Sequence, residues 1–387
     1  MSMTRHTPDI VIFGAGIAGL WAFHRYKRMG YDALLLESFG IGGGQTIASQ
    51  GIVHSGLKYA FAGKINKLAQ GISAMQNLWE AALRGEGDVD LSAAKTLSTS
   101  QYLMMNNKIM GEIIKLVTSQ ALGNNVHEVM PEDWPQEIKS SGFHGKVVFM
   151  DEPVLDIPSV LRALAEPYKD SIRKIDTPDD PFGFLKQHNI EPKHIIFTGA
   201  ASNAQIAAKE GHNHGLHTQA RPLLMGMLKP APYPLFAHLV GHTDKPVASI
   251  TTHTTREGEL VWYLGGGAAE RKKEADPQEV YDAVRKGFAK YLPAVDLSAV
   301  QWAALPIDRI EGKSGIDGWI PDTPTIHSHE NVHYCWPTKL TFAPLLAERL
   351  LEKMDIQPSK TQSDWAFLPD IDYAETPWDE AQWTDGD

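Results

Sequence analysis

Three glycines near the start of the sequence have the spacing that a dinucleotide-binding turn requires. Gly14, Gly16 and Gly19 follow the apolar run Asp9 to Phe13 in the pattern G-x-G-x-x-G. The first glycine permits a tight turn, the second lets the backbone approach a pyrophosphate, and the third lets the next helix pack on the sheet. The helix predicted over Ile17 to Met29 would offer the pyrophosphate free N–H groups and a partial positive charge.

An acidic residue ends the strand that follows this helix. Ala33 to Leu36 is predicted to be a buried strand, and Glu37 comes directly after it, 18 residues beyond Gly19. A carboxylate in this place accepts hydrogen bonds from the ribose of an adenosine and repels a 2′-phosphate. Strand, glycines, helix and acid together predict a bound dinucleotide. The alternative is a glycine-rich turn that only packs a helix on a sheet.

A second glycine-rich segment follows and leads to a histidine. It contains Gly40 and Gly42 to Gly44, and then the runs Gly44-Gln45-Thr46 and Ser49-Gln50-Gly51-Ile52-Val53-His54-Ser55-Gly56-Leu57. At these residues the chain resembles the superfamily of D-amino-acid-oxidase-like flavoproteins. Within it, the chain is most similar to glycerol-3-phosphate dehydrogenase and L-2-hydroxyglutarate oxidase. The resemblance implies that the dinucleotide is FAD.

The resemblance also implies which segments contact FAD. The loop around Gln45 and Thr46 would cover the diphosphate, and the stretch Gly51 to Gly56 would run past the isoalloxazine ring. The strand predicted over His194 to Gly199 would end beneath the cofactor. The expected cofactor-binding residues are Gly14, Gly16, Ile17, Ala18, Gly19, Glu37, Ser38, Gly44, Gln45, Thr46, Gln50, Gly51, Ile52, His54, Gly199, Thr338, Lys339, Leu340 and Thr341.

The last of these residues precede a helix near the end of the chain. Val332 to Cys335 is predicted to be the last strand, and Phe342 to Met354 is predicted to be a helix. The resemblance implies that the N-terminus of this helix points at the pyrimidine edge of the flavin. A flavin that takes a hydride at N5 gains negative charge near N1 and O2, which a lysine and a helix N-terminus would stabilise. Lys339 is therefore a candidate flavin contact, with a surface cation as the alternative.

One histidine and two following residues are candidates for catalysis. Oxidation of a hydroxy acid needs a base for the hydroxyl proton, and histidine serves near neutral pH. By resemblance His54 lies near the ring, so we expect it to be catalytic or to contact the flavin. Otherwise it is a core histidine bonded to the backbone. Lys58 and Tyr59 follow it and could line the cavity.

An acidic substrate also needs a cation, and arginine binds a carboxylate with two parallel hydrogen bonds. Arg309 is the leading candidate, and Arg221 and Arg256 are the others. The predicted catalytic set is thus His54, Arg309, Lys58 and Tyr59.

Other histidines do not suggest a site. His212, His214 and His217 match no common metal-site spacing and have no cysteine near them, so no metal is predicted. Residues on or beside predicted antiparallel strands are interpreted as sheet packing: His238, His253 and Tyr263.

The order of the predicted elements indicates an α/β protein with an α+β second domain. The resemblance implies a Rossmann-like FAD-binding domain of glutathione-reductase-2 type from residues 1–85, 145–215 and 325–363, and an antiparallel-sheet substrate or cap domain from residues 86–144 and 216–324. The 387 residues exceed what one core usually holds. Among the intervening elements, strands are predicted over Asp90 to Met105 and Gly145 to Asp151, and helices over Lys64 to Leu83 and Asn107 to Leu122.

Residues 364–387 form an unusual tail. They contain eight acidic residues, no lysine or arginine, and the tryptophans Trp365, Trp378 and Trp383. A disordered tail is rarely this aromatic. We expect an extended tail that lies on the surface of its own chain; a partner-binding segment or a flexible end are the alternatives.

The composition is typical of a soluble globular protein, with 43% apolar and 21% charged residues. A net charge of −11 argues against a nucleic-acid-binding surface. No apolar run reaches the roughly 18 residues of a membrane span, and no signal-peptide pattern precedes the first strand. With Cys335 as the single cysteine, the simplest expectation is a cytoplasmic protein.

Together these observations predict an FAD-dependent oxidoreductase that passes a hydride from a small 2-hydroxy acid or polyol phosphate to flavin N5. One alternative is an amino-acid or amine oxidase of the same superfamily. A second is a flavin-binding protein that acts with a partner, and a third is an NAD-dependent dehydrogenase, since the glycine pattern is shared. The expected partners are a small-molecule substrate and an electron acceptor, which could be oxygen, a quinone or a protein.

Overall fold

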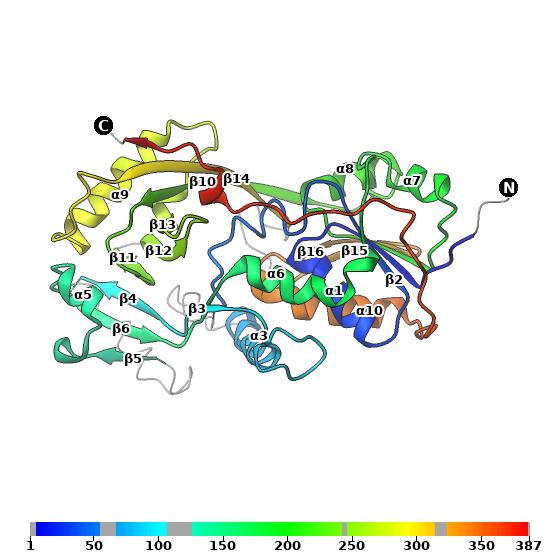
Figure 1. Ribbon diagram of the computed structural model, residues 1–387, viewed down its shortest axis with the longest axis horizontal. Coiled ribbons are helices and arrows are strands. Elements are labelled where there is room, and N and C mark those ends of the chain that lie inside the picture. The colour runs from blue at the N-terminus through cyan, green and yellow to red at the C-terminus, as the bar shows by residue number, and fades with distance from the viewer. Residues whose placement is uncertain (1–4, 55–66, 107–125, 242–245, 314–322, 386–387) are drawn as a thin grey trace.

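The computed structural model describes residues 5–54, 67–106, 126–241, 246–313 and 323–385. Within these residues the chain forms two large sheets that lie at opposite ends of an elongated molecule (Figure 1). Lys58, Tyr59 and the helix predicted over Asn107 to Leu122 lie outside the described residues. In the described part, no helix has the length and apolar character needed to cross a bilayer.

The first sheet has six strands in the order β15-β16-β9-β1-β2-β8. All neighbours in it are parallel except β15 and β16, which pair antiparallel. This is the predicted Rossmann-like arrangement. Its strands are β1 (Ile10–Phe13), β2 (Ala33–Glu37), β8 (Ile172–Lys174), β9 (His194–Phe197), β15 (Thr325–His329) and β16 (Val332–Trp336).

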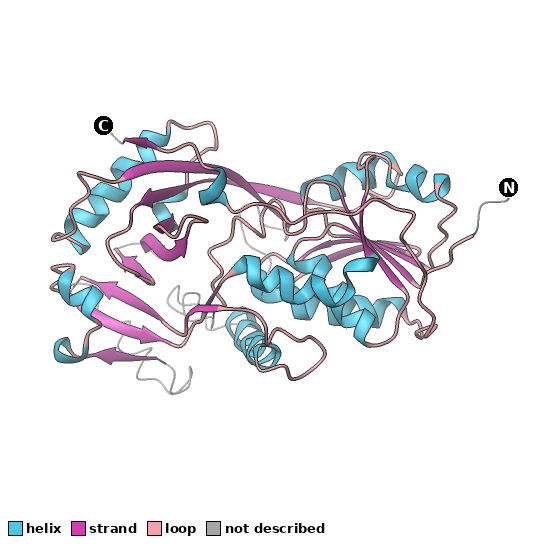
Figure 2. Cartoon of the chain, viewed as in Figure 1, coloured by secondary structure: helices cyan, strands magenta, loops and turns pink. Residues whose placement is uncertain are grey.

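Helices cover both faces of this sheet (Figure 2), so its central strands are apolar on both sides. In β1, Ile10 and Ile12 pack into one cluster, while Val11 and Phe13 pack into another. The helices on the first face are α1 (Ile17–Arg28), α6 (Ile157–Ala165) and α10 (Ala343–Met354), and those on the second are α7 (Pro181–Gln187) and α8 (Ala201–Lys209). The helix α3 (Lys67–Leu83) lies beside the first group.

The second sheet has nine strands in the order β17-β14-β10-β13-β12-β11-β4-β6-β5. Most neighbours pair antiparallel, as predicted, and β4 and β11 pair parallel. Its strands are β4 (Gln101–Met105), β5 (Val126–Val129), β6 (Lys146–Met150), β10 (Thr218–Lys229), β11 (Ala237–Val240), β12 (Pro246–Thr254), β13 (Leu260–Gly265), β14 (Gln301–Gly312) and β17 (Thr384–Asp385). The amphipathic helix α9 (Pro277–Tyr291) buries Val280, Val284 and Phe288 against one face.

Three predictions about strands need correction. Asp90 to Met105 is not one strand: only β3 (Thr96–Ser98) and β4 are strands, and β3 pairs with β7 (Val154–Leu155). The strand predicted from Gly145 is β6, which pairs with β4 and β5, so the chain leaves the nine-stranded sheet only after Met150 and not at 145. Val332 to Cys335 is not the last strand, because β17 forms in the tail. An apolar period identifies a buried strand but not its neighbours.

Two further short α-helices are α5 (Gln136–Ser140) and α11 (Pro377–Glu380). The tail that contains α11 packs on its own chain, with Trp365 and Trp378 both buried.

The buried His333 lies beside the half-buried His194 on the six-stranded sheet. Nδ1 of His194 lies 3.1 Å from Nε2 of His333, and Ser328 Oγ lies 2.9 Å from Nδ1 of His333. Burial, with the neighbouring His194 and Lys353, lowers the pKa of His333 to about 4. The folded protein therefore keeps His333 neutral at pH values where the unfolded chain would protonate it.

Acid should destabilise the protein through this histidine. A histidine with a lowered pKa in the folded state favours unfolding once the pH falls below its unfolded pKa of 6.5. Through His333, the free energy of unfolding of the wild type should fall by roughly 2 kcal/mol between about pH 7.5 and about pH 5. We expect this part of the fall to be absent in His333→Gln. Denaturant unfolding at both pH values measures the effect, with the exposed His144→Gln as control. The same pH dependence in His333→Gln and the wild type would contradict it.

Candidate functional site

One large cavity lies where the parallel strands end. Its volume is about 900 Å³, within the range of roughly 300–1,000 Å³ that is typical of ligand and cofactor pockets. Parallel strands end at the same sheet edge, so the cavity wall contains the ends of β1, β2, β9 and β16: Phe13, Glu37, Phe197 and Trp336. Since β1 lies between β2 and β9, this is the point at which open α/β sheets bind ligands.

At Gly14 and Gly19 the chain around the turn between β1 and α1 has no room for a side chain. Gly14 has a φ of +106°, and a Cβ there would lie 2.9 Å from the backbone N of Gly199. A Cβ on Gly19 would lie 1.9 Å from the carbonyl oxygen of Gly14, so Gly19 packs α1 against the turn and does not line the cavity. Gly16 does line it, and a Cβ there would contact only Thr46 Oγ1, at 3.0 Å.

The N-terminus of α1 faces the cavity and suits an anion. Its N-cap is Gly16 and its first turn carries no acidic residue. The N–H of Ile17 donates to Thr46 Oγ1 at 3.0 Å, which holds the second glycine-rich loop over the helix start. In that loop Gly44 has a φ of +70° and open space around it. A helix start beneath a glycine loop supplies the donors that a diphosphate requires.

Glu37 is fixed at the cavity rim by backbone donors. Its Oε2 accepts from the N–H of Ala15 at 2.7 Å, and its Oε1 accepts from Ser38 at 2.7 Å and Phe39 at 3.0 Å. A carboxylate has about four acceptor positions, so these bonds orient Glu37 and still leave it able to accept from a ribose.

The segment between β16 and α10 also lines the cavity. Thr338, Lys339, Leu340 and Thr341 all belong to the wall. Thr338 has a φ of 68°, an unfavourable conformation for a β-branched residue. Ala200, also in the wall, has a φ of 51°. Backbone strain of this kind concentrates at functional sites.

Two buried hydroxyl groups support a bound cofactor. Thr341 is 1% exposed, and its Oγ1 has no hydrogen-bond partner among the described residues. The same holds, within the described part of the chain, for Oγ of Ser49. Both residues line the cavity. Because a buried polar atom without a partner is costly, a polar ligand in the cavity fits these residues.

His54 lies in the wall beside a buried carboxylate. The chain from Gly51 to His54 runs antiparallel to the start of β7: Val53 N–H donates to Pro153 O at 2.9 Å, and Leu155 N–H donates to Gly51 O at 2.9 Å. This register brings Nδ1 of His54 to 3.2 Å from Oε2 of Glu152, which is 1% exposed. Since a carboxylate only accepts, Nδ1 carries the proton and Nε2 the lone pair.

A second histidine, His238, lies close to the first. The two rings are 6.4 Å apart between centroids and inclined by 29°, and both line the cavity. Nδ1 of His238 lies 2.7 Å from Oγ of Ser249, its register partner across β11 and β12. We had interpreted His238 as sheet packing and had not singled out Glu152. Only the fold brings these residues to His54, because they come from distant parts of the chain.

The arginine candidates separate into two places. Arg221 and Arg309 face each other across β10 and β14 and both line the cavity. Nε of Arg221 donates to Glu311 at 3.2 Å, and its Nη2 contacts the other oxygen of this buried carboxylate. Arg256 lies outside the cavity wall and pairs with Glu375 of the tail.

Three residues interpreted as packing or as non-sites lie outside the cavity wall. His253 stacks on Trp378 with centroids 4.2 Å apart, and Tyr263 donates to Ala48 O at 2.7 Å. His212 stacks on His329 with centroids 4.0 Å apart. Among the described residues, no group of histidine, cysteine, aspartate or glutamate has the arrangement of a metal site.

Nearly all the expected cofactor residues thus meet at one cavity. Of the nineteen proposed from the sequence, all except Gly19 belong to its wall. Of the predicted catalytic set, His54 and Arg309 belong to the wall, while Lys58 and Tyr59 lie outside the described residues.

A family model described as FAD dependent oxidoreductase matches residues 9–352. The chain belongs to this family. A probable FAD-dependent oxidoreductase from Pseudomonas aeruginosa is 36% identical over 386 residues, which cover 96% of this chain and 98% of the relative. The crystal structure of the same Pseudomonas protein matches with a TM-score of 0.80 and 32% identity, over 97% of this chain and 98% of the other.

More distant solved structures share the fold. Glycine oxidase from Geobacillus kaustophilus matches with a TM-score of 0.63 and 14% identity, over 91% of this chain and 96% of the other. L-alpha-glycerophosphate oxidase from Mycoplasma pneumoniae, solved with FAD bound, matches with a TM-score of 0.60 and 11% identity, over 93% and 100%. This protein is accordingly an FAD-dependent oxidoreductase, and the finer placement near glycerol-3-phosphate dehydrogenase and L-2-hydroxyglutarate oxidase stays a prediction.

The hydroxyl of Thr341, which has no hydrogen-bond partner in the described part of the chain, gives a test of the cofactor site. We expect Thr341→Val to leave the stability of the apoprotein unchanged or slightly raised, because no hydrogen bond among the described residues is lost. The same change should weaken FAD binding by up to about tenfold. Flavin fluorescence titration of the apoprotein measures the affinity, and thermal unfolding measures the stability.

Thr252→Val is the matched control. Thr252 is also a buried threonine, but its Oγ1 accepts from Leu235 N at 2.7 Å and donates to Leu235 O at 3.0 Å. This control should destabilise the apoprotein. A Thr341→Val variant that loses as much stability as Thr252→Val, or that binds FAD as the wild type does, would refute the assignment.

Proposed function

We propose that this protein oxidises a small 2-hydroxy acid, with FAD held in the cavity described above. The observation that carries the proposal is the pair formed by His54 and the buried Glu152 in the cavity wall. A carboxylate behind an imidazole is the arrangement of a general base, and an alcohol must lose its hydroxyl proton when its carbon is oxidised.

The cavity wall supports one orientation of the cofactor. The turn of Gly14 and Gly16, the start of α1 and the loop of Gln45 and Thr46 would hold the diphosphate, and Glu37 the adenosine ribose. Ser49, Gly51, Lys339 and Thr341 would then contact the flavin end. FAD, when bound, accepts the two electrons and the hydrogen that leave the substrate carbon.

His54 would take the hydroxyl proton at Nε2. Glu152 orients the ring through Nδ1 and stabilises the positive charge that the imidazole gains. Gln101, which is fully buried, donates from Nε2 to the same Glu152 oxygen at 3.4 Å. Glu152 is thereby hydrogen-bonded to both His54 and Gln101, and the lone pair on Nε2 of His54 points away from the carboxylate.

The substrate carboxylate needs a cation near the same space. Arg309 and Lys339 both line the cavity, and either would bind an acidic group. Burial of the wall strengthens such a contact, since charges in a desolvated site interact more strongly than in water. A polyol phosphate carries an anionic group and a hydroxyl too, and is the second candidate substrate class.

A substrate panel tests the reaction class. The purified FAD-loaded protein, kept free of oxygen, is mixed with L- and D-2-hydroxy acids, the matching amino acids and glycerol 3-phosphate, and flavin absorbance near its visible maximum is followed. We expect bleaching by a 2-hydroxy acid or, failing that, by glycerol 3-phosphate. Bleaching only by an amino acid would replace this proposal with an amino-acid oxidase. No bleaching by any of them would favour a protein that acts with a partner.

Variants of the dyad test the base. His54→Gln should slow flavin reduction by about 10²–10⁴-fold at neutral pH. Glu152→Gln should slow it by roughly ten- to a hundredfold, because one charged hydrogen bond is lost while the imidazole remains. The exposed His127→Gln is the control and should react as the wild type does.

The pH profile separates a base from a structural histidine. If His54 accepts the proton, the acidic fall in the rate of flavin reduction should disappear in His54→Gln. A His54→Gln variant that keeps the wild-type profile and rate would show that another group takes the proton.

A further inference from the structure

The acidic, aromatic residues 364–385, which we call the strap, span both sheets. Trp365 and Leu368 are buried against the six-stranded sheet, and Thr384 pairs with Trp302 in the nine-stranded sheet. Figure 1 shows the strap in red, passing along one side of the molecule from the region of β2 to the C-terminus near α9. The chemistry proposed above makes no use of this segment.

The middle of the strap is anchored beside α6. The ring of Tyr373 lies 4.7 Å from Nζ of Lys169 and 5.0 Å from the guanidinium carbon of Arg162, measured to the ring centre. Its hydroxyl donates to Oε1 of Glu166 at 2.6 Å. Lys169 also donates to the carbonyl oxygen of Ile371 at 2.6 Å. These contacts hold the strap backbone in position just before and just after Tyr373.

The strap backbone next to Tyr373 is hydrogen-bonded to both the N–H and the carbonyl oxygen of Ile41, a loop residue. The N–H of Ile41 donates to Asp372 O at 2.9 Å, and the N–H of Ala374 donates to Ile41 O at 3.0 Å. Ile41 is fully buried. A Cβ on Gly40 would lie 3.1 Å from the backbone N of Ala374, so the strap and the loop are in direct contact.

Ile41 begins the loop that reaches the cavity. The next residue, Gly42, donates to Ala15 O at 2.8 Å, and the loop continues through Gly44 and Gln45 to Thr46 in the cavity wall. The loop is therefore attached to the glycine-rich turn on one side and to the strap on the other. Its position over the start of α1 depends on both attachments.

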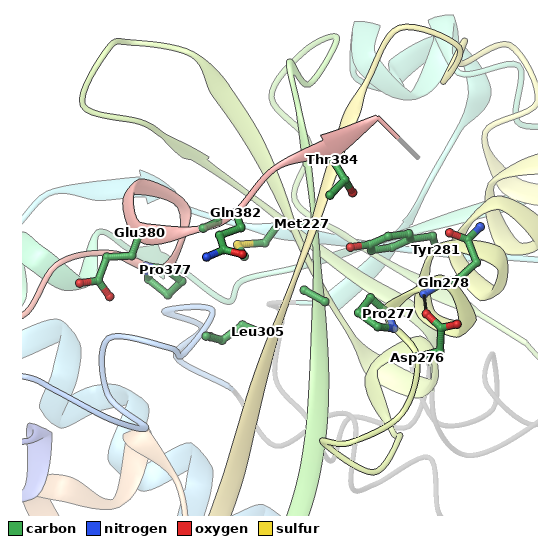
Figure 3. A pocket seen from close by; sticks show the side chains of 12 residues that line it. Met227, Asp276, Pro277, Gln278, Tyr281, Leu305, Pro377, Glu380, Gln382 and Thr384 are labelled. Carbon is green, nitrogen blue, oxygen red and sulfur yellow. Dashed lines mark hydrogen bonds between the residues drawn. The ribbon is translucent and has the colours of Figure 1, made fainter. Parts of the chain in front are cut away.

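The far end of the strap is fixed to the nine-stranded sheet. Arg256, in the turn between β12 and β13, pairs with Glu375, and its N–H donates to Asp379 at 2.9 Å. Trp378 stacks on His253. Figure 3 shows the following residues passing over β10 and β14, beside a second cavity of about 610 Å³ that also includes Tyr281 and Leu305.

We propose that the strap positions the loop 41–46 over the FAD diphosphate, so that Asp372 and Ala374 determine how tightly FAD is held. The proposal rests on the cofactor site of the proposed function, but not on its substrate. The two backbone bonds restrict the loop before the cofactor arrives, which lowers the ordering cost of binding. Loss of one bond should then appear mainly in FAD affinity.

Ala374→Pro removes the N–H that donates to Ile41, and Ala374→Ser is the matched control that keeps it. We expect the proline variant to raise the FAD dissociation constant about five- to tenfold over the serine variant. Titration of each apoprotein with FAD, followed by flavin fluorescence, gives the constants. Equal constants within about twofold would overturn the proposal.

A second pair of variants applies if Ala374→Pro does not fold. Tyr373→Ala removes the partly exposed ring and phenol that hold the strap beside α6, and Tyr373→Phe keeps the ring. The alanine variant should release FAD about threefold faster or more, with the phenylalanine variant in between. Release at the wild-type rate in Tyr373→Ala would overturn the proposal.

The outcomes separate the two proposals. A wild-type protein that binds no FAD would overturn both. A wild-type protein that binds FAD but oxidises no hydroxy acid would overturn the proposed substrate class and leave the strap proposal standing. Normal FAD binding in these variants would overturn the strap proposal alone.

Discussion

The contact between Gly14, Gly19 and the end of β9 is the constraint on which the rest of the site depends. A side chain on Gly14 or Gly19 would collide with backbone atoms of the turn or of Gly199. The contact lets α1 start immediately after β1 and brings β9 against the same turn. Without it, the start of the helix could not face the space at the strand ends, and the cavity would lack its anion-binding wall.

The cavity is completed by contacts between the two sheets. Gln50, directly before the His54 segment, donates from its amide to Ser249 O at 3.1 Å and to Tyr263 O at 3.0 Å. Tyr263 in turn donates to Ala48 O at 2.7 Å. The segment that carries His54 is thus bonded to the nine-stranded sheet on one side and to β7 on the other. Such fixed polar contacts hold a catalytic group more precisely than a free loop would.

The parts of the site that could be predicted from the sequence are those set by local chain geometry. The glycine spacing and the acid at the end of β2 are recognisable from the local sequence, and the family resemblance supplied the other segments, including the one before α10. All of these segments contribute residues to the same cavity wall. The strand over Gly145 to Asp151 was identified but assigned to the FAD-binding domain, whereas β6 pairs within the nine-stranded sheet. The spacing of apolar residues predicts that a strand is buried, but it does not predict which sheet the strand belongs to.

Partners across long sequence separations could not be predicted. Glu152 reaches His54 only because Gly51 to His54 runs antiparallel to the start of β7, and nothing in the spacing of these residues indicates that register. His238 reaches the same place through β11. The aromatic tail was expected to lie on its own chain, and the two backbone bonds to Ile41 could not be anticipated, since backbone pairing leaves no trace in residue type.

The charge of the site contrasts with that of the whole chain. A net charge of −11 opposes the approach of an anionic cofactor and of the proposed acidic substrate, so their recognition has to come from local groups. One of these is already committed: Arg221 compensates the buried Glu311, and a buried carboxylate that lost its arginine would be strongly destabilising. Arg221 therefore serves mainly to hold the wall together. In the proposed function, anion recognition is assigned to helix N-termini and to Arg309 and Lys339, which line the cavity.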